Sequence, residues 1–89
     1  MSNPRYKISS NVILYSDEDL FVVYDSKGGK VFELNEVAFY ICEKCNHPID
    51  LKAICDLVSQ EYTVDFDLVE VDTKEILSQF LENNIVCLV

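Results

Sequence analysis

The side chains that could do chemistry in this sequence are four cysteines, one histidine and a large set of carboxylates. Cys42 and Cys45 form a C-x-x-C pair, while Cys55, Cys87 and His47 lie outside it. A zinc site needs four ligands, usually arranged as two close pairs, and C-x-x-C can also serve redox chemistry. Only one close pair is present here. Because a free cysteine behaves as a small hydrophobe, the pattern favours core packing over a metal site.

The carboxylates and the histidine do not combine into a catalytic set. His47 precedes Pro48 in a predicted loop, with no serine nucleophile placed nearby. No pair of carboxylates recurs on an apolar helix face, so a nucleophile, a base and an orienting group cannot be assembled. The glycine-containing segment 25–29 lacks the Lys-Ser/Thr signature and the following helix of a phosphate loop. The sequence therefore predicts a binding protein that is not an enzyme and carries no metal or cofactor.

The charge of the chain restricts its partners. Sixteen acidic against seven basic residues give a formal net charge of −9, which is unfavourable for binding phosphates and argues against a nucleic-acid partner. The excess acid indicates either solubility or a neutral or basic partner, and both readings stay open. No run of about 18 apolar residues exists, and the first residues lack a signal-peptide core. We expect one cytoplasmic domain over residues 1–89, away from any membrane.

Three antiparallel strands are expected at residues 11–16, 20–24 and 30–34, forming a meander. The second run is apolar on both faces, as expected of a central strand. Gly28 and Gly29 can supply the positive φ of the hairpin that follows it. The alternation of the third strand directs Phe32 and Leu34 to the core and Val31 to the other face. Its outer edge carries unpaired N–H and C=O groups, which are either a liability or a binding site.

Three helices are expected to follow the strands. Asn35 is a strong N-cap, so the third strand passes directly into a helix ending near Cys45. Asp50 caps a second helix, and Asp67 or a neighbour caps a third, which ends at Asn84 in a left-handed conformation. Residues 1–10 are interpreted as a loose segment with Tyr6 and Ile8 as candidate anchors, and residues 85–89 as an apolar tail that packs back. The predicted class is α+β, with a three-stranded meander followed by three helices.

A series of short motifs resembles the PqqD-like family. These motifs are Leu34-Asn35-Glu36, Ile41 to Cys45, Asp50-Leu51 with Ile54, Asp72 with Ile76-Leu77, Phe80, and Asn84-Ile85-Val86. The resemblance extends from about Val12 to Val86, and the order and spacing of the motifs carry it. The chain departs from the family pattern at His47 and Asn84, where the family has glycine, and at Thr73, where it has valine. Asn tolerates the left-handed region, so the change at Asn84 is mild.

The resemblance implies a winged-helix-like fold and a role as a RiPP recognition element. Such stand-alone elements are similar to peptide chaperones: they bind the leader of a ribosomally made precursor for natural-product biosynthesis. Partner enzymes, of radical SAM or lasso-peptide protease and cyclase type, then modify or process the precursor. In this family the leader joins the third strand as an added antiparallel strand, in a groove against the third helix. The open edge expected from the strands agrees with this mode of binding.

Carried over by position, the resemblance implies a peptide-binding site from two elements. The edge residues are Lys30, Val31, Phe32, Glu33 and Leu34, and the groove wall consists of Leu68, Val69, Asp72, Thr73 and Ile76. Core packing is the alternative for Val69 and Ile76, and one helix can both face the core and line a groove.

Two other classes of function stay open at this point. A winged helix that binds DNA needs a basic recognition helix, yet residues 67–83 contain Lys74 against five acidic residues. A small zinc or redox module would be built on Cys42 and Cys45. An electrophoretic shift at low salt tests the first class, and a metal assay tests the second.

Overall fold

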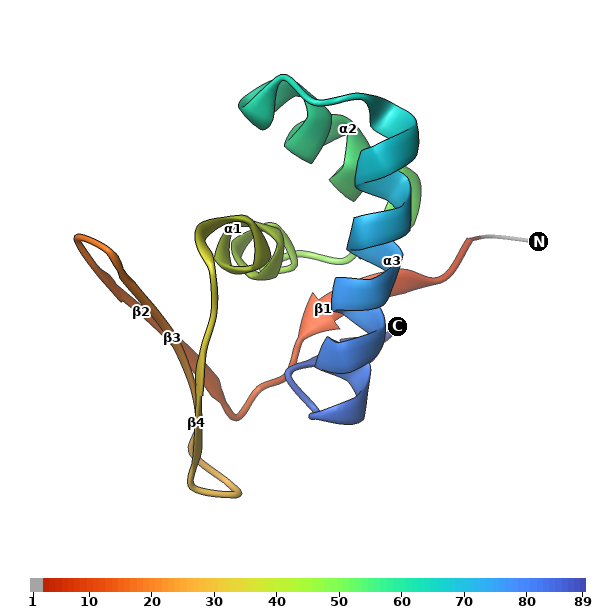
Figure 1. Cartoon of the computed structure of the whole chain (residues 1–89). Helices are drawn as coiled ribbons and strands as arrows, with labels where there is room; N and C mark the ends of the chain where they lie inside the picture. Colours follow the sequence, from red (N-terminus) through yellow and green to blue (C-terminus); the bar gives the residue numbers. More distant parts are fainter. Residues whose placement is uncertain (1–2) are drawn as a thin grey trace.

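The computed structural model describes residues 3–89 and contains two separate antiparallel sheets (Figure 1). The first sheet is the predicted meander, in the order β2-β3-β4. Its strands are β2 (Val12–Asp17), β3 (Leu20–Asp25) and β4 (Lys30–Glu33). The second sheet has the order β5-β1-β6. Its strands are β5 (Ile49–Asp50), β1 (Arg5–Ile8) and β6 (Val86–Leu88). The α+β class and the meander are therefore confirmed, whereas winged helix is only a loose description of this arrangement.

The hairpin between β3 and β4 is held by its own turn. Gly29 has a φ of 71° and its N–H donates to the carbonyl of Asp25 at 2.7 Å. The Asp25 carboxylate also accepts the N–H groups of Lys27 and Gly28. Among the described residues Gly29 is the only glycine with a positive φ, so one glycine of the pair is enough for this turn.

The second sheet corrects the expectation of a loose start to the chain and confirms that the apolar tail packs back. The described part of residues 1–10 is not loose, since Tyr6 pairs with Ile49 of β5 on one side and Leu88 of β6 on the other. The apolar tail is a strand whose Val86 pairs with Ile8. The β1–β6 pairs join segments about 80 residues apart in sequence and the β1–β5 pairs join segments more than 40 residues apart, so no local turn signal predicts them. Residues 1 and 2 lie outside the described part.

The helices begin and end close to the predicted positions. They are α1 (Glu36–Lys44), α2 (Leu51–Tyr62) and α3 (Phe66–Glu82). Asn35 and Asp50 act as N-caps, their side chains accepting the N–H groups of Ala38 and Ala53 at 2.8 Å. The cap of α3 is Asp65, two residues before the predicted Asp67, because its carboxylate accepts the Asp67 N–H.

The C-terminal end of α3 turns directly into β6. Asn84 has a φ of 59°, as predicted, and the N–H of Ile85 donates to the Phe80 carbonyl at 2.8 Å. This pattern closes a helix by a left-handed residue followed by a hydrophobic contact. Because Ile85 is 1% exposed, the turn also anchors the second sheet in the core.

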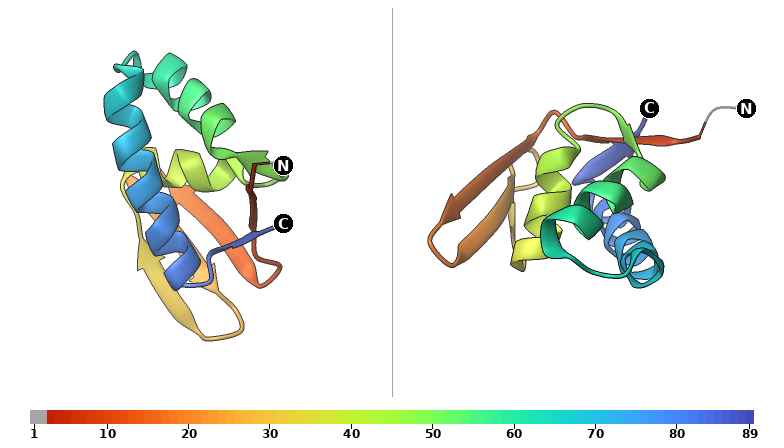
Figure 2. Two further views of the ribbon diagram at one scale, coloured as in Figure 1. Left: turned by 90° about the vertical axis from the view of Figure 1, so that its right-hand side faces the viewer. Right: turned by 90° about the horizontal axis from the view of Figure 1, so that it is seen from above.

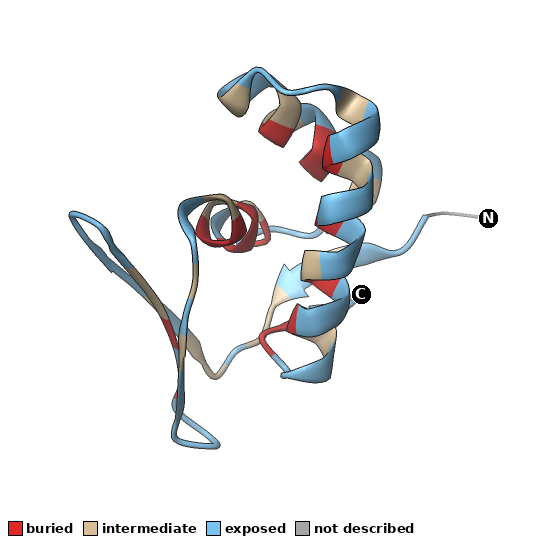
Figure 3. Ribbon diagram, viewed as in Figure 1, coloured by how far each residue is buried: buried red, intermediate tan, exposed pale blue. Residues whose placement is uncertain are grey.

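The core lies between the helices and one face of each sheet (Figures 2 and 3). Its fully buried members come from distant elements: Val23 of β3, Ile41 and Cys42 of α1, Ile54 of α2 and Leu77 of α3. The meander touches the helices through α1, where the rings of Phe21 and Phe39 lie 5.3 Å apart. In Figure 1 this sheet stands at the left with α1 on one side, and no described element covers its other side.

Candidate functional site

The open edge of β4 is the first component of the candidate site. Within residues 3–89, β4 pairs only with β3, and its Leu34 end is tied to that strand, since the Leu34 N–H donates to the Phe21 carbonyl at 2.8 Å. Hydrogen-bonded and non-hydrogen-bonded pairs alternate along an antiparallel ladder. The N–H and C=O groups of Val31 and Glu33 therefore point away from β3. They are free to pair with an additional strand.

A pocket of about 370 Å³ lies between α3 and the start of α1, which follows β4 directly, and forms the second component; none of its lining residues belongs to β4 itself. Its lining residues are Asn35 and Val37, from the start of α1, and Asp72, Glu75, Ile76 and Gln79, from α3. Beside it lies a smaller pocket of about 130 Å³ with a mainly apolar lining that shares Val37, Asp72 and Ile76. We call these two adjoining pockets the β4–α3 groove.

The predicted edge residues alternate as the sequence analysis expected. Phe32 and Leu34 are half-buried against the core, whereas Val31 is 64% exposed and Glu33 is also exposed. Lys30 is exposed at the start of β4, next to the hairpin turn.

The predicted wall residues of α3 divide between the groove and the core. Asp72 and Ile76 line the groove. Val69 and Thr73 are 5% and 1% exposed, so they are core side chains that reach only the inner end of the smaller pocket. Leu68 is 63% exposed, one turn before Asp72 on the same helix face. Ile76 packs on the core and lines both pockets, so it is both a core residue and a groove residue.

Sequence reasoning missed four residues of the larger groove pocket, and Val58, Tyr62 and Val64 of the smaller one. Asn35 and Val37 line the larger pocket, as do Glu75 and Gln79. A signal for the last two was present, because positions 68, 72, 75, 76 and 79 recur at the spacing of one helix face. Asn35 was recognised only as a helix cap, yet it also lines the larger groove pocket.

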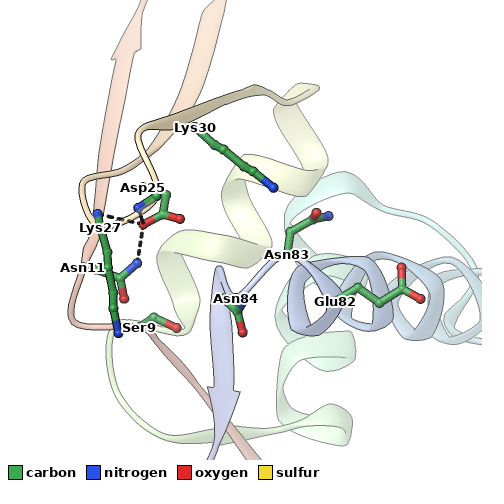
Figure 4. A pocket seen from close by; sticks show the side chains of 9 residues that line it. Ser9, Asn11, Asp25, Lys27, Lys30, Glu82, Asn83 and Asn84 are labelled. Carbon is green, nitrogen blue, oxygen red and sulfur yellow. Dashed lines mark hydrogen bonds between the residues drawn. The ribbon is translucent and has the colours of Figure 1, made fainter.

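A larger, polar pocket of about 490 Å³ lies at the other end of β4, between the hairpin and the end of α3 (Figure 4). Lys27 and Lys30 line it together with Asp25 and Glu82. The N–H of Gly28 and the side-chain amide of Asn11 donate to the Asp25 carboxylate and hold its pKa below the ordinary value. The Asp25 carboxylate therefore stabilises the β3–β4 hairpin. This pocket offers no apolar anchor, so the β4–α3 groove is the better candidate for binding.

The cysteines lie apart from the groove. Cys42, Cys45 and Cys55 are buried, as predicted, and Cys87 is exposed on β6. Burial raises the pKa of both Cys42 and Cys45 to about 12, which leaves them as neutral thiols at neutral pH and poor nucleophiles. Among residues 3–89, no three His, Cys, Asp or Glu side chains are grouped to hold a metal ion. None of the helices described is long and apolar enough to cross a membrane.

Three solved structures resemble this fold over most of its length. TbiB1 in complex with the TbiA(beta) leader peptide is 26% identical, with a TM-score of 0.79, covering 90% of this chain and 93% of that chain. Lasso peptide synthetase B1 complexed with the leader peptide is 18% identical, with a TM-score of 0.76, covering 92% and 96%.

The third structure is the PqqD truncation of PqqCD from Methylobacterium extorquens, described as a functional and stand-alone RiPP recognition element. It is 16% identical, with a TM-score of 0.77, covering 93% of this chain and 88% of that chain. At this identity it shows the fold alone, as does the lasso peptide synthetase. A comparison with curated proteins finds no match.

The sequence profile of one family covers most of the elements described above. It matches residues 21–86, from β3 to the first residue of β6, and includes the edge strand and all three helices. The family is described as coenzyme PQQ synthesis protein D, and the resemblance found in the sequence motifs is confirmed. This chain belongs to the PqqD family.

Proposed function

We propose that this chain is a RiPP recognition element, which binds the leader of a ribosomally synthesised precursor peptide and presents it to a modifying or processing enzyme. The observation that carries the proposal is the open edge of β4 beside the β4–α3 groove. The likeness to TbiB1, whose structure holds a leader peptide, supports it. The chain would do this in the cytoplasm, where ribosomes release the precursor, and residues 1–89 would act as one domain.

The edge provides affinity through the main chain. An antiparallel leader strand would pair with the N–H and C=O groups of Val31 and Glu33 without disturbing the bonds between β3 and β4. Alternate side chains of such a strand point to opposite faces of the sheet. Those on the inner face would enter the β4–α3 groove.

The groove provides specificity through its lining. Val37 and Ile76 form an apolar floor for a leader side chain, and Asp72 and Glu75 place two carboxylates at the mouth. Among the lining residues of the larger groove pocket there is no basic side chain, so a leader lysine or arginine is favoured there over an acidic residue. The same carboxylates make this face of α3 unlike the basic helix that DNA binding needs.

The proposed role is recognition without catalysis. His47 is exposed in the loop between α1 and β5, away from the groove. Three of the thiols are buried. The chemistry therefore belongs to the partner enzyme, and this chain contributes affinity and position.

The test is a titration with the leader of the precursor encoded beside this gene, followed by amide hydrogen exchange. We expect saturable binding by fluorescence anisotropy, with new protection at the N–H groups of Val31 and Glu33. A scrambled leader of the same composition is the control. If the true leader binds no better than the scrambled one, the proposed function is wrong. If it binds but leaves both N–H groups unprotected, strand addition at β4 is wrong.

A further inference from the structure

The face of the meander that points away from α1 is apolar and uncovered. Alternation along the strands places one set of side chains on this face, which we call the outer sheet face. Its apolar members are Ile13, Tyr15, Leu20, Val22, Tyr24 and Val31. Ile13 and Tyr15 are each 56% exposed and Val31 is 64% exposed. No described helix or strand lies over this face of the sheet (Figures 1 and 3).

The strand registers show that these side chains form one patch. Ile13 lies opposite Tyr24, and Tyr24 lies opposite Val31, so a single row crosses all three strands. Tyr15 lies opposite Val22 in the adjacent row. Directly opposed residues on one face have their Cβ atoms about 4.5–5.5 Å apart, which makes the rows continuous.

The fold does not need this patch for its own stability. The opposite face of the same strands supplies the core contacts, through the fully buried Val23, the half-buried Phe32 and the ring of Phe21 against Phe39. An antiparallel sheet of this kind normally has polar residues on its solvent face. A contiguous exposed apolar patch marks an interaction site, and tyrosines are frequent anchors of protein interfaces.

The charges around the patch distinguish between possible occupants. Asp17, Glu18 and Asp19 lie at the β2–β3 turn and Glu33 lies on β4, and they outnumber the two exposed lysines, Lys27 and Lys30, at the β3–β4 hairpin. A second copy of this chain would bring the same acidic rim and a further net charge of −9. Like charges across an interface are unfavourable, so the rim favours a partner whose apolar surface is bordered by basic residues.

We propose that the outer sheet face docks another protein, through an apolar patch with a basic rim on that partner. The outer sheet face is continuous with the β4 edge, and this position identifies the role of the partner. Val31 directs its side chain to the outer sheet face and its N–H to the open edge, so a protein seated on this face lies next to the bound leader. The partner is the enzyme that receives the precursor, and this identification rests on the proposed function.

The experiment measures two affinities for each variant. The probes are the leader and the modifying enzyme encoded beside the precursor gene. Ile13→Ser with Tyr15→Ser changes β2, the strand farthest from the leader edge, and should weaken enzyme binding at least tenfold while leader affinity stays within twofold. The matched control is Leu88→Ser with Val89→Ser, two exposed apolar side chains at the other sheet, which should change neither affinity.

The outcomes separate this proposal from the proposed function. Absence of leader binding by the unmodified chain overturns the function. Leader binding with enzyme affinity unchanged in the Ile13 and Tyr15 variant, or with no enzyme binding by the unmodified chain, overturns the docking face. If sedimentation shows a dimer that this variant dissociates, the face is a contact between copies and the proposal is wrong.

A second measurement avoids the double serine variant, whose fold the two substitutions could disturb. Replacing Tyr15 by p-benzoylphenylalanine retains an aromatic ring, and illumination should crosslink it to the enzyme. The same photoreactive residue at Val89 should give no such crosslink. Crosslinking at Val89 but not at Tyr15 overturns the docking face.

Discussion

The two sheets described have three strands each and opposite environments. The β5-β1-β6 sheet joins the chain ends to the helices: the Ile8 N–H donates to the Cys45 carbonyl at 2.8 Å and the Ser9 N–H to the Ile85 carbonyl at 3.0 Å. The β2-β3-β4 sheet touches the helices on one face, while its other face and its β4 edge remain open.

This difference assigns stability mainly to the β5-β1-β6 sheet and binding to the β2-β3-β4 sheet. A strand that pairs on both sides or holds buried residues contributes to the free energy of folding. A strand with free backbone groups can exchange water for a partner at no structural cost. The four predictions below test this division, from the largest expected effect to the smallest.

The strongest test places the same charge in each sheet. Val86→Asp puts a carboxylate at a site that is 2% exposed on β6, and it should lower the free energy of unfolding by roughly 3 kcal/mol or more. Val31→Asp, at a site that is 64% exposed, should lower it by less than about 1 kcal/mol. Urea denaturation measures both. Equal losses would show that the two sheets contribute alike to stability.

The second test removes one backbone donor from the open edge. Val31→Pro eliminates an N–H that points away from β3, so the ladder to β3 survives. Leader affinity should fall at least tenfold, about 1.4 kcal/mol. Val31→Thr keeps the N–H and the branched shape, and should bind the leader nearly as well as the original chain. A folded proline variant with unchanged affinity would place the leader elsewhere.

The third test concerns the thiols of the helical core. Cys42→Ala with Cys45→Ala creates small cavities and should lower the free energy of unfolding by about 1–2 kcal/mol in total. Folding holds both thiol pKa values near 12, above the ordinary 9, so the folded state retains protons that the unfolded state releases. The two thiols therefore do not lower the free energy of unfolding below pH 9, and they lower it progressively as the pH rises from 9 towards 12.

Alkylation checks the same burial by mass spectrometry. The folded chain should take up one iodoacetamide, at the exposed Cys87, and the unfolded chain four. Rapid labelling of Cys42 or Cys45 in the folded chain would contradict their burial. Elemental analysis that finds one zinc per chain, lost in the double variant, would overturn the packing role of the C-x-x-C pair.

The smallest effect is on the rate of leader association. A basic leader should associate several-fold more slowly when salt is raised from low to physiological, where the Debye length is about 8 Å, with little change in dissociation. Asp72→Asn should reduce this salt dependence, since Asp72 lines the groove. Glu70→Gln is the matched control, because Glu70 lines a separate pocket with Tyr6 and Leu51. Stopped-flow fluorescence distinguishes the two rates. Equal effects of the two variants would indicate general steering by net charge.

Local patterns in the sequence were enough to determine most of the elements. The three strands of the meander, the caps at Asn35 and Asp50 and the left-handed Asn84 all depend on neighbouring residues, and all are confirmed. Burial of Cys42 and Cys45 followed from helical spacing in the same way. The family could be recognised because its motifs lie on these local features.

Only the tertiary structure decided what lies beside what. The pairing of Tyr6 with Ile49 and Leu88 depends on segments that meet after the helices have packed. The same packing buries Val69 and Thr73 while leaving Glu75 and Gln79 at the groove. The apolar run of β3 correctly indicated a central strand, yet it could not show that one of its faces has no cover. A sequence pattern records which side chains share a face, whereas exposure depends on distant elements that the pattern does not contain.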